Sequence, residues 1–378
     1  MNAMRLSCLL VVLPIWLAGI VPAAAAEPDT SNIRRDERVI FFPTDATLSA
    51  DGKAWSIPVH GWVFEPESVD LLRNAVIREI REDLAFVPDR KSVQRFEERM
   101  RLFLVDNERS KQLVVRIAGD LLRLPPSDKD GHCFGTLTLA AEKARANVKD
   151  GWLNFEAMLP RADTRRFTGA VQLVEPEGLT VVSDIDDTVK ITQVTDKAEL
   201  VANTFFREYR VVEGMAETYR RWQADGASFT FVSGSPWQLA SPLSAMLDDA
   251  KFPRASISLR RVRLKNRQVA DLLDSPEDFK LTTIGDLFKR YPGRRFVLVG
   301  DSGERDPEVY GRLTREVPAQ VVHIFIRDVT SEPADAARYR SAFQNVPGDK
   351  WTLFKTPAEI RGRRFTLPSP PQGERGRG

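Results

Sequence analysis

Hydrophobic and polar positions along the chain follow two different patterns, and the change falls near Glu175. Before it, short alternating or apolar runs are typical of strands. These runs are Trp55 to Phe64, Leu102 to Val105, Leu113 to Ile117, Phe134 to Leu139, Trp152 to Leu159 and Ala170 to Val174. After it, apolar strands alternate with helical segments, which predicts a parallel sheet with helices on its faces. We expect a smaller mostly-β domain over residues 38–174, followed by an α/β domain with a Rossmann-like parallel sheet over residues 175–360.

Two further segments depart from these patterns. Within the first region, Leu72, Val76, Ile80 and Leu84 recur at i, i+4 spacing before a charged stretch, which predicts a helical insertion. Residues 366–378 are rich in proline, glycine and arginine and predict a disordered tail.

The first 26 residues have the pattern of a signal peptide. Arg5 precedes an apolar run from Leu6 to Val21, and alanines at 24–26 provide a cleavage site. The alternative is a single membrane anchor, but the run is short for a bilayer and contains Pro14. We therefore expect a periplasmic or secreted protein, released by cleavage.

Composition narrows the class of protein. The 378 residues are 42% hydrophobic and 29% charged, which excludes wholesale disorder and a multispanning membrane protein. The formal net charge is +2, so bulk electrostatics do not predict nucleic acid as a partner. Only three histidines occur, scattered along the chain, which disfavours a histidine-built zinc site and leaves carboxylates as catalytic groups. Cleavage would remove Cys8 and leave Cys133 alone, so no intramolecular disulfide is expected.

Three predicted strands of the second region end in polar clusters. The five strands expected there are Leu179 to Ser183, Phe229 to Val232, Ala255 to Leu259, Phe296 to Val299 and Val321 to Ile326. The clusters are residues 184–188 (DIDDT), 233–235 (SGS) and 300–303 (GDSG). Ligands of open α/β sheets bind at the carboxyl ends of the strands. The three clusters therefore predict one pocket assembled from distant parts of the sequence.

The acidic residues of these clusters suit metal-assisted phosphoryl chemistry. Asp184 and Asp186 place two carboxylates in one site, where one can act as a nucleophile and the other can carry a proton. Magnesium prefers such hard oxygen ligands, and Asp301 and Asp306 supply further carboxylates from the third cluster. A calcium loop is the alternative, but Val189 and Thr195 stand where an EF-hand needs glycine and glutamate.

Phosphoryl oxygens need donors and a positive charge. The Ser233 hydroxyl and the backbone N–H groups from Gly234 onward could bind them. Lys280, at the start of a predicted helix, is the candidate cation, with Lys265 and Lys289 as competitors. Ser233 and Gly234 could instead form an ordinary turn, and only their position after an apolar strand favours the phosphate site.

Three other features keep two interpretations each. Lys190 could pair with the acidic cluster or approach the substrate. Trp237 could be a core residue or line an acyl site. The basic run from Arg260 to Arg267 could be a solvated edge or a site for an anionic headgroup.

These motifs, in this order, resemble the four motifs of the haloacid-dehalogenase-like phosphatase superfamily. The strings DIDDTVKIT (184–192), FVSGSPW (231–237), GDSGERDPEVY (300–310) and IRDV (326–329) look more narrowly like the catalytic domain of actin-patch-associated phosphatidate phosphatases and their bacterial relatives.

The resemblance implies a role for each matching residue. Asp184 would be the nucleophile, Asp186 the general acid/base, and Thr188 would shape the first motif. Ser233 and Lys280 would contact the phosphoryl group. Asp301 would bind Mg²⁺ with support from Asp306, and the backbone carbonyl of Asp186 would join the metal shell.

Neither segment between these motifs is long enough for a large cap, so we expect an open site. An open site favours a large or lipid phosphomonoester, such as phosphatidate, and peripheral contact with a membrane. The competing hypotheses are a phosphatase of soluble or protein-borne phosphate, a phosphotransferase, and a non-catalytic binding protein on the same scaffold.

Overall fold

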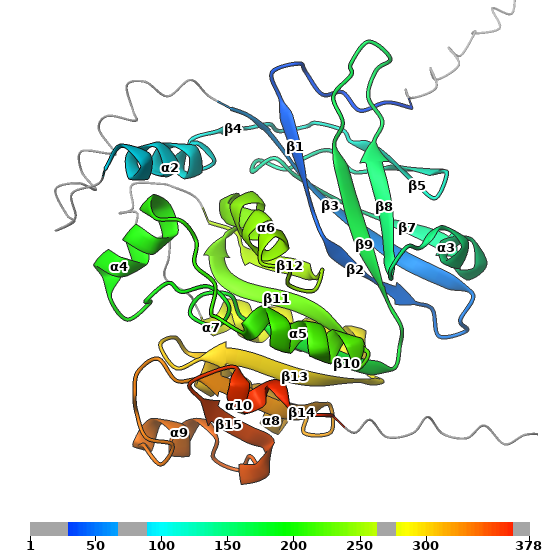
Figure 1. Cartoon of the computed structure of the whole chain (residues 1–378). Helices are drawn as coiled ribbons and strands as arrows, with labels where there is room; N and C mark the ends of the chain where they lie inside the picture. The colour runs from blue at the N-terminus through cyan, green and yellow to red at the C-terminus, as the bar shows by residue number, and fades with distance from the viewer. Residues whose placement is uncertain (1–28, 67–88, 263–276, 366–378) are drawn as a thin grey trace, which may run out of the picture.

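The computed structural model describes residues 29–66, 89–262 and 277–365, which form two β-sheets (Figure 1). The first sheet has nine strands among these residues, in the order β1-β3-β2-β9-β8-β5-β6, with β4 and β7 also paired to β3. Their bounds are β1 Arg38–Phe42, β2 Thr44–Leu48, β3 Ala54–Glu65, β4 Asp106–Asn107, β5 Val114–Ile117, β6 Asp120–Arg123, β7 His132–Ala140, β8 Trp152–Ala157 and β9 Thr168–Val174. The mostly-β character predicted for this region is confirmed.

The long strand β3 organises the first sheet. Its side chains alternate between buried and less buried over most of its length, and it pairs antiparallel with β1, β2, β4 and β7. The pairing of β2 with β9 is parallel and joins the two ends of the region. The short helix α3 Ala141–Asn147 follows β7.

One predicted strand, Leu102 to Val105, is wrong. The charged stretch forms helix α2 Arg90–Arg101, and the backbone N–H groups of residues 102–104 continue its turns. Phe103 is buried because its ring packs edge-on against Phe205, with 5.7 Å between ring centroids. The apolar run therefore ends a helix. The helical insertion predicted from Leu72 to Leu84 lies outside the described residues.

The second sheet is parallel at every pairing described, in the order β12-β11-β10-β13-β14-β15. The bounds are β10 Gly178–Ser183, β11 Ala227–Pro236, β12 Ser256–Arg260, β13 Arg294–Asp301, β14 Val321–Arg327 and β15 Trp351–Phe354. The predicted Rossmann-like sheet is thus confirmed, with all five expected strands. The sequence analysis missed β15, which has only four residues, three of them partly exposed.

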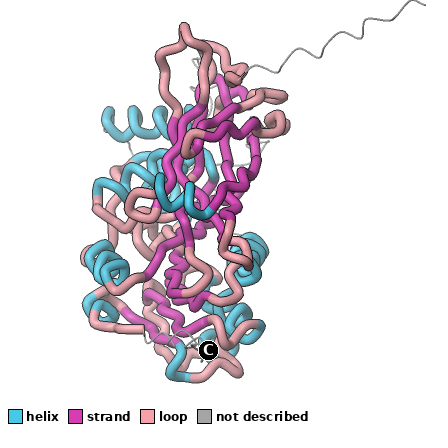
Figure 2. The backbone as a smooth tube through the Cα atoms, turned by 90° about the vertical axis from the view of Figure 1, so that its right-hand side faces the viewer, coloured by secondary structure: helices cyan, strands magenta, loops and turns pink. Residues whose placement is uncertain are grey.

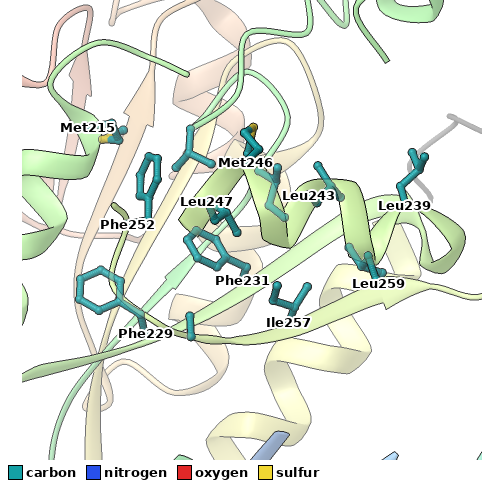
Figure 3. Close-up of a cluster of buried hydrophobic side chains, with 14 of the residues drawn as sticks. Met215, Phe229, Phe231, Leu239, Leu243, Met246, Leu247, Phe252, Ile257 and Leu259 are labelled. Atoms are coloured by element: carbon teal, nitrogen blue, oxygen red, sulfur yellow. The ribbon is translucent and has the colours of Figure 1, made fainter. Parts of the chain in front are cut away.

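Helices cover both faces of this sheet. Helices α5 Met215–Ala224 and α6 Ala240–Asp249 pack on one face, and α7 Glu277–Arg290 and α8 Asp306–Glu316 on the other. Figure 3 shows how Leu243 and Leu247 of α6 lie over Phe231 and Ile257 of the strands. The remaining helices are α4 Lys197–Val201, the π-helix η1 Ala202–Phe206, η2 Trp237–Leu239, α9 Ala337–Ala342, η4 Gly348–Lys350 and α10 Ala358–Arg361.

The two sheets follow one another in the chain and contact each other directly. Figure 2 shows the strands of the first sheet above the α/β region. The buried Asp45 of β2 accepts hydrogen bonds from Ser256 Oγ (2.6 Å) and Thr230 Oγ1 (3.2 Å) of the second sheet. The Tyr291 hydroxyl donates to the Ala46 carbonyl at 3.1 Å. The first sheet is therefore held against the β11–β12 edge of the second. The boundaries expected for the two domains are not tested by these contacts and stay predictions.

Residues 1–28 and 366–378 lie outside the described residues, so the signal peptide and the disordered tail also stay predictions. Cys133 is buried and carries a free thiol. Among the described helices, none combines the length and the apolar character that crossing a bilayer requires.

Candidate active site

The predicted site residues meet at the carboxyl ends of β10, β11 and β13. Asp184 directly follows β10, and its backbone N–H donates to the Val299 carbonyl of β13 at 2.9 Å. The chain then turns at Asp187, whose φ of 51° is in the left-handed region. Its carboxylate accepts the backbone N–H groups of Thr192, Gln193 and Val194, at 2.7 to 2.9 Å. Asp187 therefore closes the loop that presents both predicted catalytic carboxylates, a role that we did not predict.

Asp184 is buried, with 1% of its surface exposed. Its Oδ1 lies 2.9 Å from Lys280 Nζ, and its Oδ2 meets no hydrogen-bond donor among the described residues. Burial raises the pKa of the Asp184 carboxyl well above its ordinary value, although Lys280 opposes the shift. An oxygen without a donor is unusual for a buried carboxylate, and it leaves one face of Asp184 available to a reactant or a cation.

Asp186 has the opposite environment. Its Oδ1 accepts hydrogen bonds from Lys190 Nζ at 2.6 Å and Thr192 Oγ1 at 2.8 Å. Its Oδ2 accepts from Ser235 Oγ at 2.7 Å and Ser233 Oγ at 3.2 Å. Burial alone would raise the pKa of Asp186, but Lys190 and the hydroxyl donors together lower it to about 2. Lys190 is thus the partner of the acidic cluster, and Asp186 is a fixed carboxylate with every oxygen in use.

The second cluster lies directly beside Asp186. Ser233 Oγ, besides its contact with Asp186, accepts the Ser235 N–H at 3.0 Å. The β11–β12 pairing shifts register between Ser233 and Pro236, so the backbone is irregular at this point. The Gly234 carbonyl accepts from Arg260 Nε at 3.1 Å. Thr188 is fully buried, and its Oγ1 has no hydrogen-bond partner among the described residues.

Lys280 lies in the first turn of α7 and is almost completely buried. Its Nζ contacts three carboxylates: Asp306 Oδ1 at 2.5 Å, Asp184 Oδ1 at 2.9 Å and Glu304 Oε2 at 2.9 Å. These carboxylates outweigh burial and raise the pKa of Lys280 well above its ordinary value. Its competitor Lys289 is exposed and pairs with Asp286, whereas Lys265 lies outside the described residues. Lys280 is therefore the cation that the structure brings to the site.

Three carboxylates form a compact acidic cluster among the described residues: Asp184, Asp301 and Glu304, with one oxygen of each within 4.8 Å of the others. Asp301 Oδ1 accepts the N–H groups of Gly303 and Glu304, at 2.6 and 3.1 Å, while its Oδ2 has no donor. The sequence analysis missed Glu304. An acidic residue in the short loop after Asp301 was the signal that could have identified it.

The carboxylates of Asp186 and Asp306 lie outside this cluster. The sequence analysis assigned the backbone carbonyl of Asp186 to the metal shell and Asp306 to its support, and both assignments stay predictions. Asp186 is occupied by its four donors. Asp306 Oδ2 accepts the Asp301 N–H at 3.1 Å, and its Oδ1 contacts Lys280. Asp306 therefore holds the loop and the lysine in place through both of its oxygens.

The acidic cluster suits a divalent cation. It brings together three carboxylates, two of which, Asp184 and Glu304, also contact Lys280. Burial raises the pKa of Asp301 well above its ordinary value, which shows how unfavourable the charged form is without a counterion. Donor-free oxygens on Asp184 and Asp301 are hard ligands of the kind that Mg²⁺ prefers. The residues present thus fit Mg²⁺, which Asp184, Asp301 and Glu304 would hold.

Two arginines fix the loops that carry these groups. Arg338 of α9 donates to the backbone carbonyls of Ser302 and Glu304 and pairs with Glu308. Arg327, at the end of β14, donates to the Asp187 carbonyl at 2.6 Å. Both arginines are far from the acidic residues in the sequence, and their contacts position the loops after β13 and β10.

The expectation of an open site stays a prediction. Lys280, Asp184 and Asp301 are each buried. A Cβ added to Gly303 would lie 2.6 Å from Val194 Cγ2, so the two loops are in close contact. The first inter-motif segment contains only α4 and η1 before α5, as expected without a large cap. The second segment includes residues 263–276, which are outside the described part of the chain.

The other two ambiguous features are also resolved in part. Trp237 is buried, which favours the core interpretation. Arg260 contacts Gly234, and Arg261 pairs with Asp128 at 2.6 Å. Arg261 is exposed although it is paired, and Arg260 is partly buried, at the β12 edge of the sheet. Arg263, Lys265 and Arg267 lie outside the described residues, so both interpretations of the run stay predictions.

Comparison with known proteins confirms the resemblance stated from the motifs. Residues 179–328 match the model of the family described as phosphatidate phosphatase APP1, catalytic domain. Phosphatidate phosphatase APP1 of Saccharomyces cerevisiae is 30% identical over 204 residues, covering 53% of this chain and 34% of that protein. An uncharacterized protein of Schizosaccharomyces pombe is 30% identical over 194 residues, covering 49% and 32%. The chain spans about a third of the length of these relatives.

Solved structures give weaker similarities. A phospho-aspartyl intermediate analogue of phosphoserine phosphatase is 11% identical, with a TM-score of 0.30, covering 48% of this chain and 96% of that one. Cytosolic 5'-nucleotidase IIIB bound to cytidine is 10% identical, with a TM-score of 0.31, covering 49% and 83%. TM-scores this far below 0.5 carry no weight in the assignment. By its motifs and the family match, the part of the chain from 179 to 328 is similar to the catalytic domain of phosphatidate phosphatase APP1.

Proposed function

We propose that this protein is a magnesium-dependent phosphomonoester hydrolase that acts through an aspartyl-phosphate on Asp184, with phosphatidate or another lipid phosphate as its substrate. The observation that carries the proposal is the state of Asp184. Its carboxylate is buried, with Oδ1 against Lys280 and Oδ2 without a donor, at the edge of the acidic cluster. A carboxylate nucleophile needs an unblocked oxygen and a nearby positive charge, and Asp184 has both.

The reaction divides into two steps. In the first, an Asp184 oxygen attacks phosphorus, and the leaving oxygen takes a proton from Asp186. In the second, Asp186 takes a proton from water, the water oxygen attacks phosphorus, and the bond to Asp184 breaks to release phosphate. Lys280 stabilises the negative charge that develops on the phosphoryl oxygens. When bound, Mg²⁺ would polarise a phosphoryl oxygen and offset this charge.

To act as the acid, Asp186 must gain a proton after the substrate binds. With no substrate bound, the pKa of Asp186 is about 2 because Lys190 and three hydroxyl groups hold its ionised form, although burial opposes them. A phosphate group bound beside it adds a second negative charge, which raises the pKa of this carboxyl. The proton for the leaving oxygen is therefore acquired with the substrate in place. Ser233, between Asp186 and the phosphate position, can turn its hydroxyl to either group.

The lipid substrate class is supported by the family match and by the name of the yeast relative. An extracytoplasmic site of action is supported by the apolar segment from Leu6 to Val21 and the alanines after it. Both belong to the proposal.

The test is phosphate release by the purified chain, with Mg²⁺ or EDTA. Substrates are phosphatidate in mixed micelles and a panel of water-soluble phosphomonoesters, and Asp184→Asn is the control. We expect Mg²⁺-dependent release from phosphatidate that Asp184→Asn abolishes. Release from soluble esters alone would retain the mechanism and reject the lipid. Absence of release from every ester would favour a binding protein on this scaffold.

A further inference from the structure

A groove of about 790 Å³ lies between the first sheet and the β12 edge of the second. One wall is helix α7, which contributes Phe279, Thr283, Leu287 and Arg290. These positions fall on one stripe of the helix because they are three or four residues apart. Phe279 and Arg290 are eleven positions apart, which is about 17 Å at the rise of an α-helix. The groove is therefore elongated along α7.

The opposite wall comes from the mostly-β region. Strands β3 and β7 supply His60 and Phe134, whose rings stack with 4.3 Å between centroids. His60 also contacts His132, with 2.8 Å between Nε2 and Nδ1. Burial is the main cause that lowers the pKa of His60 well below its ordinary value, and that of His132 to about 4. The two histidines of this wall are therefore in the neutral form at neutral pH.

One end of the groove comes close to the second polar cluster of the proposed active site, although none of the proposed catalytic residues lines it. Arg260 lines the groove and donates to the carbonyl of Gly234, the neighbour of Ser233, at 3.1 Å. Helix α7 starts at the catalytic edge of the sheet and leads back to the first residue of β13 at the opposite edge. The groove therefore extends from the neighbourhood of Gly234 along α7 to Arg290.

The middle of the groove is lined by apolar side chains, which suits the hydrocarbon tail of a lipid. Apolar side chains from both walls and from the strands between them line it: Phe42, Val59, Phe134, Leu259, Phe279 and Leu287. Phe134 is 48% exposed, and Leu121, at 42%, is the other large hydrophobic side chain exposed to this extent in the described part of the chain. Leu121 does not line the groove. An exposed aromatic side chain in a concave surface next to a reactive centre is typical of ligand contact.

The far end of the groove is polar. Asp45 is 5% exposed, and its Oδ1, without a hydrogen-bond partner among the described residues, lies in the lining. Arg290 lies at the same end. These groups limit the apolar part of the groove to the stretch along α7 between Phe279 and Leu287, which is the part that a hydrocarbon chain can fill.

We propose that this groove binds the apolar tail of a lipid phosphomonoester whose phosphate lies at Asp184. This inference rests on the proposed function and makes the mostly-β region part of the substrate site. The volume lies within the range of ligand pockets, about 300 to 1,000 Å³. Each methylene removed from water strengthens binding by about fourfold, so activity rises with chain length until the apolar stretch is filled.

Neighbouring threonines of α7 provide a matched test. Thr283 lines the groove, whereas Thr282 lies on another side of the same helix. We compare wild type, Thr283→Trp and Thr282→Trp on phosphatidates of increasing acyl length and on a water-soluble aryl phosphate. Thr283→Trp should lower kcat/KM for long-chain phosphatidate at least tenfold and leave the soluble ester within about twofold, because the indole fills the groove. Thr282→Trp should behave as wild type.

A second pair of variants tests the same groove without tryptophan substitutions, in case these impair folding. Phe134→Ala and Leu121→Ala each shorten an exposed hydrophobic side chain of the same sheet. Only Phe134→Ala should reduce the preference for long chains. Equal long-chain activity in Thr283→Trp and Thr282→Trp, or in the two alanine variants, would overturn the groove assignment. Wild-type release from soluble esters alone would overturn it while preserving the phosphatase. A wild type inactive on every ester would overturn both proposals.

Discussion

At the scale of single residues, the site depends on the different surroundings of Asp184 and Asp186. The two carboxylates are two positions apart and both are buried. Three hydroxyl groups and a lysine hold Asp186 in its ionised form, whereas Asp184 keeps an oxygen without a donor. With neither substrate nor cation bound, these pKa directions are the reverse of what the two roles need. The assignment of Asp184 as the nucleophile therefore rests on its donor-free oxygen and its contact with Lys280.

The acidic residues of the β13 loop give a prediction at this scale. Glu304→Gln should weaken Mg²⁺ binding about tenfold or more, because it removes a carboxylate from the acidic cluster. Asp306→Asn should instead lower stability, because Asp306 contacts Lys280 and the Asp301 N–H. The measurement is the shift of the melting temperature during a Mg²⁺ titration. Equal Mg²⁺ responses in Glu304→Gln and wild type would remove Glu304 from the site.

Part of the site followed from the sequence for a simple geometric reason. Asp184, Ser233 and Asp301 each follow an apolar strand, and the carboxyl ends of parallel strands meet at one edge. Glu304 and Asp187 were missed because loop conformation decides whether a carboxylate faces the site or caps its own backbone. Arg338 was missed because its contact with the Glu304 carbonyl joins segments that no local pattern connects.

At the scale of elements, the loop between β13 and α8 is held by close packing around Gly300. A Cβ at this position would lie 2.3 Å from Asp306 Oδ2 and 2.6 Å from Asp306 Cγ. The same carboxylate accepts the Asp301 N–H and contacts Lys280. Because Gly300 has no side chain, the Asp306 carboxylate at the start of α8 can pack against the end of β13. From there it contacts both the Asp301 N–H and Lys280.

Two glycine substitutions test this packing. Gly300→Ala should destabilise the protein by about 1 to 3 kcal/mol, because Asp306 must move out of a well-packed position. It should also lower kcat, because Lys280 would lose its contact with Asp306. Gly285→Ala is the control, since its Cβ would meet only Leu313 at 3.9 Å, and it should stabilise α7 by about 0.5 to 1 kcal/mol. Chemical unfolding curves measure the stability of both variants, and activity assays measure their kcat. Gly300→Ala with wild-type stability and activity would contradict this account.

The elements themselves were predicted unevenly. Five of the six strands of the second sheet were recognisable as short apolar runs, and β10 and β13 are buried over almost their whole length. Leu102 to Val105 misled the analysis because a short apolar run can equally end a helix. The order of the first sheet, including the parallel pair β2 and β9, depends on contacts between distant segments and had no local signal.

At the scale of the whole molecule, Asp45 links the two sheets. It lies on β2 and accepts hydrogen bonds from Thr230 and Ser256 of the second sheet. Burial raises the pKa of the Asp45 carboxyl to about 6, although these hydroxyl groups oppose the shift. An ionised carboxylate at this junction therefore costs stability at neutral pH.

Asp45→Asn tests this cost through its pH dependence. Between about pH 4 and pH 6 the folded state binds a proton that the unfolded state has lost, so this group's contribution to stability decreases as the pH rises through that window. Asparagine does not titrate. The variant should gain up to about 3 kcal/mol relative to wild type on going from about pH 4 to about pH 7.5. Chemical unfolding at both pH values provides the measurement, and a difference that does not change with pH would show that Asp45 does not titrate in this way.

The central claim is that Asp184 becomes phosphorylated during turnover. The most direct measurement is peptide mapping of the protein after acid quenching of turnover with ³²P-labelled substrate, in the presence of Mg²⁺. The account predicts one labelled peptide that contains Asp184, sensitive to hydroxylamine and absent from Asp184→Asn, which is inactive. Undiminished phosphate release by Asp184→Asn, with no labelled peptide, would contradict it.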